Sequence, residues 1–177
     1  RPQSVYEASY HEQSLCFEPS PAGLTVEGAL KSGEYKLAGN VSSQFISGLL
    51  FALPLLAGDS TLHLIPPVES RSYIEMTRAA QRRFGVESRW QDENTLFLPG
   101  GQQYAPCDYT VEGDYSQAAF PAVLGAVRGG VTLKGLSADT LQGDAAILGI
   151  LRRCGAELSV TDEGIRLGKA LLRGTDI

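Results

Sequence analysis

The sequence predicts an α/β fold assembled from repeated βαβαββ units, each a strand, helix, strand, helix and β-hairpin in that order. Two stretches of the 177-residue chain show this order, and the second follows the first at an offset of about 70 residues. Phe84-Gly85-Val86-Glu87 in the first stretch corresponds to Cys154-Gly155-Ala156-Glu157 in the second. Apolar residues recur at helical spacing in some segments and alternate with polar residues in others. Strands that alternate with helices in this way indicate a mixed α/β architecture.

The first copy contains an expected helix at 42–56. The apolar side chains of this helix fall on one face at a period near 3.6 residues. Asn40 or Ser42 is expected to cap this helix, and Pro54 is expected to disturb its last turn. The other expected elements are strands at 34–37 and 61–65, a helix at 73–84, and a hairpin with strands at 87–90 and 95–98.

A Gly- and Pro-rich stretch at 99–106 separates the copies and is the expected boundary between domains at 1–106 and 107–177. In the piece before the first copy, a helix at 3–13 and a strand at 24–26 are expected. The second copy is expected to contain strands at 108–111 and 131–134, helices at 116–127 and 144–154, and a hairpin with strands at 157–160 and 164–167.

Composition and charge narrow the classes of function. Hydrophobic residues make up 43% of the chain and charged residues 20%, which is typical of a globular protein and excludes a disordered one. The net charge of −5 gives no diffuse positive field, so nucleic acid and anionic membranes are not expected partners. The most apolar stretch, 49–57, is too short to span a bilayer, and no signal peptide is expected.

The cysteines and histidines show no ligand spacing. Cys16, Cys107 and Cys154 stand alone, and His11 and His63 lie in distant segments. A structural zinc site is therefore not expected. An odd number of scattered thiols is typical of a reducing compartment, which predicts a cytoplasmic protein.

One candidate anion site is the strand-to-helix junction at 39–44. Ser42, Ser43 and Gln44 place two hydroxyls and an amide where free backbone N–H groups and the positive end of a helix dipole point the same way. Such a pocket would hold an anion without a cation. The alternative is a simple N-cap, because Asn and Ser are favoured caps in any helix.

A second candidate is the loop Glu69-Ser70-Arg71-Ser72-Tyr73, which enters the next helix of the same unit. Both helix starts lie at the same end of the sheet in a strand-helix repeat, so Ser70 is expected near the first junction. The alternative is a capping segment with Arg71 in solvent. In the second copy Asp114 and Asp144 occupy the equivalent places, and they are expected to be structural because a carboxylate caps a helix but repels phosphate.

Four motifs follow one another along the chain. They are Asn40-Val41-Ser42-Ser43-Gln44-Phe45, Glu69-Ser70-Arg71-Ser72-Tyr73-Ile74, Val111-Glu112-Gly113-Asp114 and Gln142-Gly143-Asp144. In this order and at these intervals they resemble the central part of the EPSP synthase (3-phosphoshikimate 1-carboxyvinyltransferase) family. The resemblance covers Glu34–Gly168, and Arg1-Pro2 is similar to an Arg-Pro pair that starts a helix in the family.

The resemblance implies the enolpyruvyl transferase fold, in which two globes each contain three βαβαββ units. The chain would be a partial one that spans parts of both globes. Residues 1–106 would hold the end of one unit and a complete unit of the first globe, and residues 107–177 would hold the first unit of the second globe. The remainder of the same enzyme would be its partner, and self-association of the cut chain would be possible through exposed apolar helix faces.

The resemblance also implies an activity, which is transfer of the enolpyruvyl group from phosphoenolpyruvate to the 5-hydroxyl of shikimate 3-phosphate. This is a step of the shikimate pathway to chorismate and the aromatic amino acids, and the family needs no metal or organic cofactor. By position Ser42, Ser43 and Ser70 would hold shikimate 3-phosphate, Gln44 would touch both substrates, and Tyr73 would lie near the shikimate ring.

Arg1 would match an arginine of the family that grips phosphoenolpyruvate. The family's other charged residues fall outside this chain, so no catalytic residue is assigned and the isolated chain is expected to have no turnover. Two other readings stay open, a fragment like the UDP-N-acetylglucosamine enolpyruvyl transferase and a non-catalytic α/β repeat module. Replacing Ser42 and Ser43 by alanine would separate a lost ligand site from a lost cap.

Overall fold

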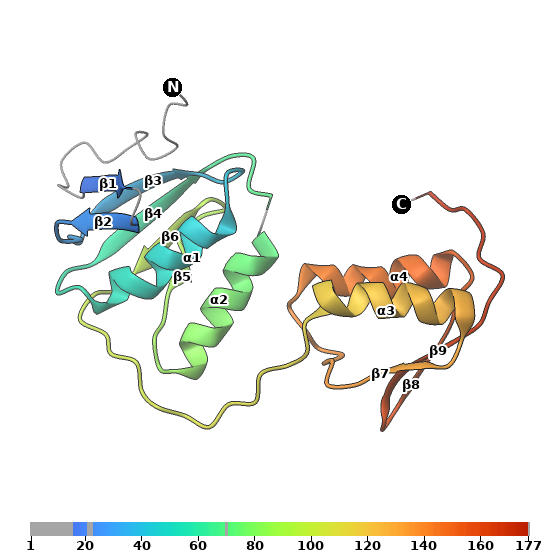
Figure 1. Ribbon diagram of the computed structural model, residues 1–177. Helices are drawn as coiled ribbons and strands as arrows, with labels where there is room; N and C mark the ends of the chain where they lie inside the picture. The colour runs from blue at the N-terminus through green and yellow to red at the C-terminus, as the bar shows by residue number, and fades with distance from the viewer. Residues whose placement is uncertain (1–15, 21–22, 70, 177) are drawn as a thin grey trace. The chain divides into compact units, whose positions relative to one another are not determined.

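The computed structural model describes residues 16–20, 23–69 and 71–176. Internal contacts divide the chain into two compact units, Arg1–Cys107 and Asp108–Ile177. The first contains β1 (Cys16–Ser20), β2 (Gly23–Glu27), β3 (Glu34–Ala38), α1 (Ser43–Ala52), the short 3₁₀ helix η1 (Leu53–Leu55), β4 (Ser60–Ile65), α2 (Arg71–Arg83), β5 (Arg89–Trp90) and β6 (Thr95–Leu98). The second contains α3 (Tyr115–Arg128), β7 (Val131–Leu133), the 3₁₀ helix η2 (Gly143–Ala145), α4 (Ala146–Arg153), β8 (Glu157–Thr161) and β9 (Gly164–Gly168) (Figure 1).

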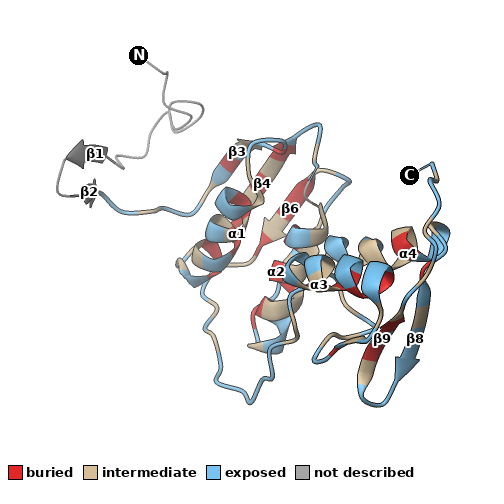
Figure 2. Cartoon of the chain, turned by 45° about the vertical axis from the view of Figure 1, so that its right-hand side comes forward, coloured by how far each residue is buried: buried red, intermediate tan, exposed pale blue. Residues whose placement is uncertain are grey.

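The first unit has the predicted βαβαββ order from β3 to β6. β3 and β4 are parallel neighbours, and β6 pairs antiparallel with β4 and with β5, so the strand order is β3-β4-β6-β5. Both helices lie on one face of this sheet (Figure 1). Buried residues concentrate on β4, β6 and the inner side of α1 (Figure 2). The core consists of Tyr35, Ile46, Leu50, Leu53, Leu62, Leu64, Ile74, Leu96 and Leu98.

Within the first unit, β1 and β2 form a separate antiparallel pair that precedes β3 in the chain. The predicted strand at 24–26 lies within β2 and is confirmed. The sequence pattern does not predict β1. The predicted helix at 3–13 lies outside the described residues.

α1 ends at Ala52, before the predicted bound at 56, and Pro54 lies in the 3₁₀ helix η1 that follows, so the predicted disturbance of the last turn is confirmed. Because proline has no N–H, the Leu50 carbonyl lacks the donor that a continuing helix would supply. The side-chain amide of Gln81 in α2 donates to this carbonyl at 2.7 Å, and the Tyr104 hydroxyl donates to the carbonyl of Phe51 at 3.1 Å. Side chains from other segments therefore satisfy the carbonyl groups at the end of α1.

The segment at 99–106 is bound to the first unit along most of its length. The backbone N–H groups of Gln102 and Ala105 donate to the carbonyls of Pro54 and Phe84 at 2.9 and 2.8 Å. These bonds join the segment to the ends of both helices, so the chain leaves the first unit only after Ala105.

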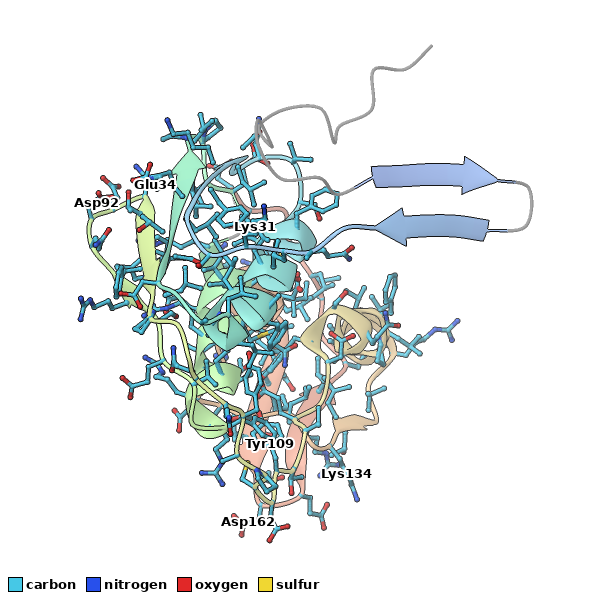
Figure 3. All side chains as sticks on the ribbon, turned by 90° about the vertical axis from the view of Figure 1, so that its left-hand side faces the viewer. Lys31, Glu34, Asp92, Tyr109, Lys134 and Asp162 are labelled. Carbon is cyan, nitrogen blue, oxygen red and sulfur yellow. The ribbon has the colours of Figure 1, made fainter. Side chains whose placement is uncertain are left out.

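In the second unit α3 and α4 lie side by side over the antiparallel sheet β7-β9-β8 (Figure 1). The helices and the hairpin appear where the sequence predicts them, and Asp162 stands at the tip of the β8–β9 turn (Figure 3). The predicted strand at 108–111 is wrong, because these residues adopt no regular structure. All four side chains are exposed, Val111 to 79%, so the alternating pattern has no apolar surface to pack against.

α3 is apolar on two sides. One side packs Ala122 and Ala126 into the core of the second unit. The other side exposes Phe120 to 75% and Leu124 to 55%. The helical spacing of these residues defines a continuous stripe, the α3 apolar face, which consists of Phe120, Val123, Leu124 and Val127.

Candidate functional site

Ser42 caps the start of α1, directly after β3 and its following loop. Its backbone is extended (φ −167°, ψ 133°), and its Oγ accepts a hydrogen bond from the Gln44 N–H at 3.2 Å. Of the two expected caps, Ser42 is therefore the one that acts. Ser43 is half-buried and Gln44 is exposed, so both polar side chains can be reached from solvent.

The loops that follow β3 and β4 meet at Gly39. The Gly39 N–H donates to the Ile65 carbonyl at 2.9 Å. A Cβ atom at Gly39 would lie 2.8 Å from Cγ2 of Val68 and 2.9 Å from the carbonyl oxygen of Pro67. Only glycine fits such a close approach. This contact holds the loop before α1 against the loop before α2.

α1 and α2 run in the same direction. The hydroxyls of Ser47 and Thr77 form a hydrogen bond at 2.7 Å, and further along both helices Gln81 donates to the Leu50 carbonyl. Two contacts that advance together along both helices require parallel axes. Since each helix follows a strand of the parallel pair β3 and β4, both N-termini lie at the same edge of the sheet.

Tyr73 belongs to this edge. It lies one helical turn before Thr77, whose hydroxyl donates to the Tyr73 carbonyl at 2.9 Å. Ser43 lies one turn before Ser47 on the neighbouring helix. The hydroxyl pair therefore places Ser43 and Tyr73 at the same level, and the Tyr73 side chain is 38% exposed.

The structure thus brings together four of the six predicted site residues at one edge. Ser42, Ser43 and Gln44 come from the start of α1, and Tyr73 comes from the first turn of α2. Ser70 and Arg1 lie outside the described residues. Two helix N-termini side by side supply backbone N–H groups and positive dipole ends, which suits an anion with several oxygen atoms.

Arg71 is not left in solvent at the start of α2. Its guanidinium carbon lies 4.3 Å from the centroid of the Trp90 ring, and its Nη1 donates to the Glu93 carbonyl at 2.8 Å. Asp92, in the same β5–β6 turn, lies at the outside of the first unit (Figure 3). The Arg71 contacts join residues distant in sequence, and no local pattern predicts them.

Glu75 and Arg78, which also belong to α2, contact Trp90. Burial alone would raise the pKa of Glu75, but the hydrogen bond from the Trp90 indole N–H and the charge of Arg78 together lower it below its usual range. The lowered pKa keeps the Glu75 carboxylate ionised beside the arginine.

Asp114 is structural, as the sequence predicts. Its carboxylate accepts the Ser116 N–H at 2.8 Å and caps α3. The expected cap by Asp144 is wrong, because Asp144 lies within η2 and the N-cap residue of α4 is Ala145, which makes no side-chain capping bond. The Gln142 side chain accepts the Tyr115 N–H at 2.8 Å and donates to Glu112 Oε1 at 3.0 Å. Burial, and next the charge of Glu112, raise the pKa of Tyr115. Gln142 is a further residue whose role the sequence does not reveal.

The part of the chain that the structure describes has neither a metal site nor a membrane span. No group of three or more His, Cys, Asp or Glu residues there could hold a metal ion. None of the helices there is long and apolar enough to cross a membrane. Cys107 and Cys154 are free thiols.

Comparison with known proteins decides the family. The family model described as EPSP synthase (3-phosphoshikimate 1-carboxyvinyltransferase) matches residues 18–177. The chain belongs to the EPSP synthase family. This match confirms the resemblance seen in the four sequence motifs and covers nearly the whole chain.

Curated relatives and solved structures agree with the EPSP synthase match. The 3-phosphoshikimate 1-carboxyvinyltransferase of Clostridium beijerinckii is 42% identical over 174 residues, which cover 97% of this chain and 40% of that protein. That of Clostridium kluyveri is 40% identical and covers 100% and 42%. The chain therefore spans 40% to 42% of the length of these two relatives.

Two solved structures share the fold. EPSP synthase from Acinetobacter baumannii has a TM-score of 0.59 at 25% identity over 82% of this chain and 33% of that one. The enolpyruvyl transferase NikO from Streptomyces tendae has a TM-score of 0.59 at 15% identity over 89% and 39%. The predicted enolpyruvyl transferase fold is confirmed.

Proposed function

We propose that the protein to which this chain belongs transfers the enolpyruvyl group of phosphoenolpyruvate to the 5-hydroxyl of shikimate 3-phosphate. The hydroxyl loses its proton as its oxygen adds to C2 of phosphoenolpyruvate, and a proton adds to C3 to give a tetrahedral intermediate. Inorganic phosphate then leaves C2 while C3 loses a proton, which restores the carbon–carbon double bond. The family match over residues 18–177 carries this proposal. The reaction takes place in the cytoplasm as a step towards chorismate and needs no metal or organic cofactor.

The chain's own part is to bind shikimate 3-phosphate. Ser42, Ser43 and Ser70 hold its phosphate, Gln44 reaches both substrates, and Tyr73 lies beside the shikimate ring. The parallel helix starts support this assignment, because their N–H groups and dipoles favour a phosphate at the edge where the hydroxyls of Ser42 and Ser43 lie.

The rest of the reaction uses two residues of this chain together with groups beyond it. Arg1 and Gln44 bind phosphoenolpyruvate, and the proton donor and the remaining cations belong to the rest of the enzyme. Residues 1–106 form part of the first globe, and residues 107–177 form the first unit of the second. The chain alone therefore binds substrate without turnover.

An amide-shift titration of the chain with shikimate 3-phosphate tests the binding site, with shikimate as the unphosphorylated control. We expect saturable shifts at Ser42, Ser43, Gln44 and Ser70 that require the phosphate group. Equal shifts with both ligands, or shifts elsewhere only, would contradict the assignment. Binding of UDP-N-acetylglucosamine instead would favour the UDP-N-acetylglucosamine enolpyruvyl transferase, and a folded chain that binds neither ligand would mean that the pocket requires the rest of the enzyme.

A chimera tests the activity. This chain would replace the matching stretch of the Clostridium beijerinckii relative, and phosphate release from phosphoenolpyruvate would be measured with and without shikimate 3-phosphate. We expect release that depends on both substrates and that is lost when Ser42 and Ser43 are both changed to alanine. A folded chimera without release would refute the proposed reaction for this chain.

A further inference from the structure

Trp90 in β5 contacts three residues of α2, which are Arg71, Glu75 and Arg78. On one side the Arg71 guanidinium carbon lies 4.3 Å from the ring centroid. At the ring edge the indole N–H donates to Glu75 Oε1 at 2.6 Å, and the Arg78 guanidinium carbon lies 5.7 Å from the centroid. Arg71 also donates to the Glu93 carbonyl in the β5–β6 turn. The chain's one tryptophan thus joins the first turn of α2 to the β5–β6 hairpin.

Arg78 joins the second turn of α2 to Ser88, which directly precedes the β5–β6 hairpin. It is only 8% exposed, and its Nη1 donates to both carboxylate oxygens of Glu75 at 2.9 and 2.8 Å. Its Nε and Nη2 donate to the hydroxyl and the carbonyl of Ser88 at 3.1 and 2.8 Å. Arg71, Glu75 and Arg78 are spaced i, i+4 and i+7, so they form one face of the helix.

Glu75 and Arg78 hold α2 at its second turn, and the Arg71 contact adds a restraint at the first residue of the helix. Tyr73 lies two residues further on, about 200° around the helix from Arg71. That side faces α1, because Thr77 on the same side bonds to Ser47. A shift of the first turn would therefore displace Tyr73 relative to Ser43.

We propose that Arg71 and Trp90 form a latch that positions the first turn of α2 against the start of α1, so that both helix starts meet one phosphate. Arg71 and Trp90 are positioning residues that do not touch the substrate. The inference rests on the proposed function, because shikimate 3-phosphate is the ligand that the two starts would share.

Hydrogen exchange on the 177-residue chain tests the latch without substrate. In Arg71→Gln, exchange of the amides of residues 75–78, which close the first turn of α2, should rise about fivefold while exchange in α1 stays unchanged. Trp90→Leu should raise exchange of the same amides at least as much, because it removes the Arg71 contact and also the indole N–H that donates to Glu75. Arg71→Lys, which keeps a cation over the ring, should restore part of the protection.

Arg89→Gln is the matched control. Arg89 lies 4.6 Å from the centroid of Phe97, a cation–π contact within the hairpin that does not involve α2. The Arg89→Gln substitution should leave hydrogen exchange in the first turn of α2 at the rate of the unsubstituted chain. Unchanged exchange in Arg71→Gln, or the same increase in Arg89→Gln, overturns the latch.

Kinetics of the chimera test whether the latch serves the site. Arg71→Gln should raise the KM for shikimate 3-phosphate about fivefold and leave the KM for phosphoenolpyruvate unchanged, with partial rescue by Arg71→Lys. Equal changes in both KM values, or no change, overturn the positioning role. If changing Ser42 and Ser43 to alanine also leaves the KM for shikimate 3-phosphate unchanged, the proposed function fails as well, whereas hydrogen exchange still decides the latch itself.

Discussion

The side-chain amide of Gln81 donates to the carbonyl of Leu50 at 2.7 Å, where Pro54 offers no N–H. Gln81 is 1% exposed, so water cannot take its place. The same amide nitrogen lies 3.2 Å from the Tyr104 hydroxyl, which donates to the end of α1 in turn. This buried hydrogen bond thus satisfies the carbonyl group that Pro54 leaves without a backbone donor at the end of α1.

Gln81→Leu should lower the free energy of unfolding by about 1–3 kcal/mol, because it leaves the buried Leu50 carbonyl unpaired. Urea unfolding followed by circular dichroism measures this loss. Pro54→Ala supplies a backbone N–H next to that carbonyl, so Gln81→Leu should cost less in the Pro54→Ala background. Equal losses in both backgrounds would show that the carbonyl is not what Gln81 stabilises.

Single alanine substitutions at Ser42 and Ser43 should distinguish helix capping from ligand binding. Ser42→Ala should cost about 1 kcal/mol of stability, because it removes the cap of α1, whereas Ser43→Ala should change stability little. Both should weaken binding of shikimate 3-phosphate. Thermal unfolding and an amide-shift titration of each variant measure the two effects. If the two variants differ in stability but both keep full affinity for shikimate 3-phosphate, capping by Ser42 is the only role of this serine pair.

Glu75 should make the stability of the first unit depend on acid. Its pKa is lowered in the folded chain, so its contribution is present above the unfolded-state pKa and is lost as pH falls through the folded-state pKa. The stability difference between the parent and Glu75→Gln should therefore shrink from neutral pH to about pH 3. Asp92, whose pKa the Asn94 N–H lowers, remains in both proteins. Urea unfolding at the two pH values measures the difference, and a constant difference would contradict the expectation.

Gln142 should stabilise the start of α3 through its donor as well as its acceptor. Gln142→Glu keeps an acceptor for the Tyr115 N–H but turns an oxygen towards the Glu112 carboxylate. It should destabilise the second unit by about 1–3 kcal/mol at neutral pH, and by less once the carboxylates are protonated. Hydrogen exchange of the α3 amides reports this change. A pH-independent loss would mean that repulsion from Glu112 is absent.

Features encoded by neighbouring residues are those that the sequence predicts well. Ser42 caps α1 and Pro54 ends it through bonds within a few residues, and the repeated order of elements marks the helices and hairpins. The strand predicted at 108–111 fails for a nonlocal reason. A period-2 pattern becomes a strand only where a neighbouring strand and an apolar surface are available, and Val111 finds neither.

The candidate site divides in the same way. The hydroxyls at 42 and 43 are visible in the sequence, and so is their place at a helix start. Two contacts are not visible in the sequence, the close approach of Gly39 to Val68 and the contact between Arg71 and Trp90. Each depends on the register of β4 with its neighbouring strands. Sequence thus identifies the groups that meet a ligand better than the groups that hold them in place.

The α3 apolar face also sets how the chain behaves as temperature and salt change. Attraction between apolar surfaces in water weakens on cooling and strengthens in sulfate and phosphate buffers. With the Phe120 ring largely in solvent, the chain should stay dissolved best in the cold and at low concentrations of such salts. Gentle warming should cloud a concentrated solution well below the temperature at which either unit unfolds.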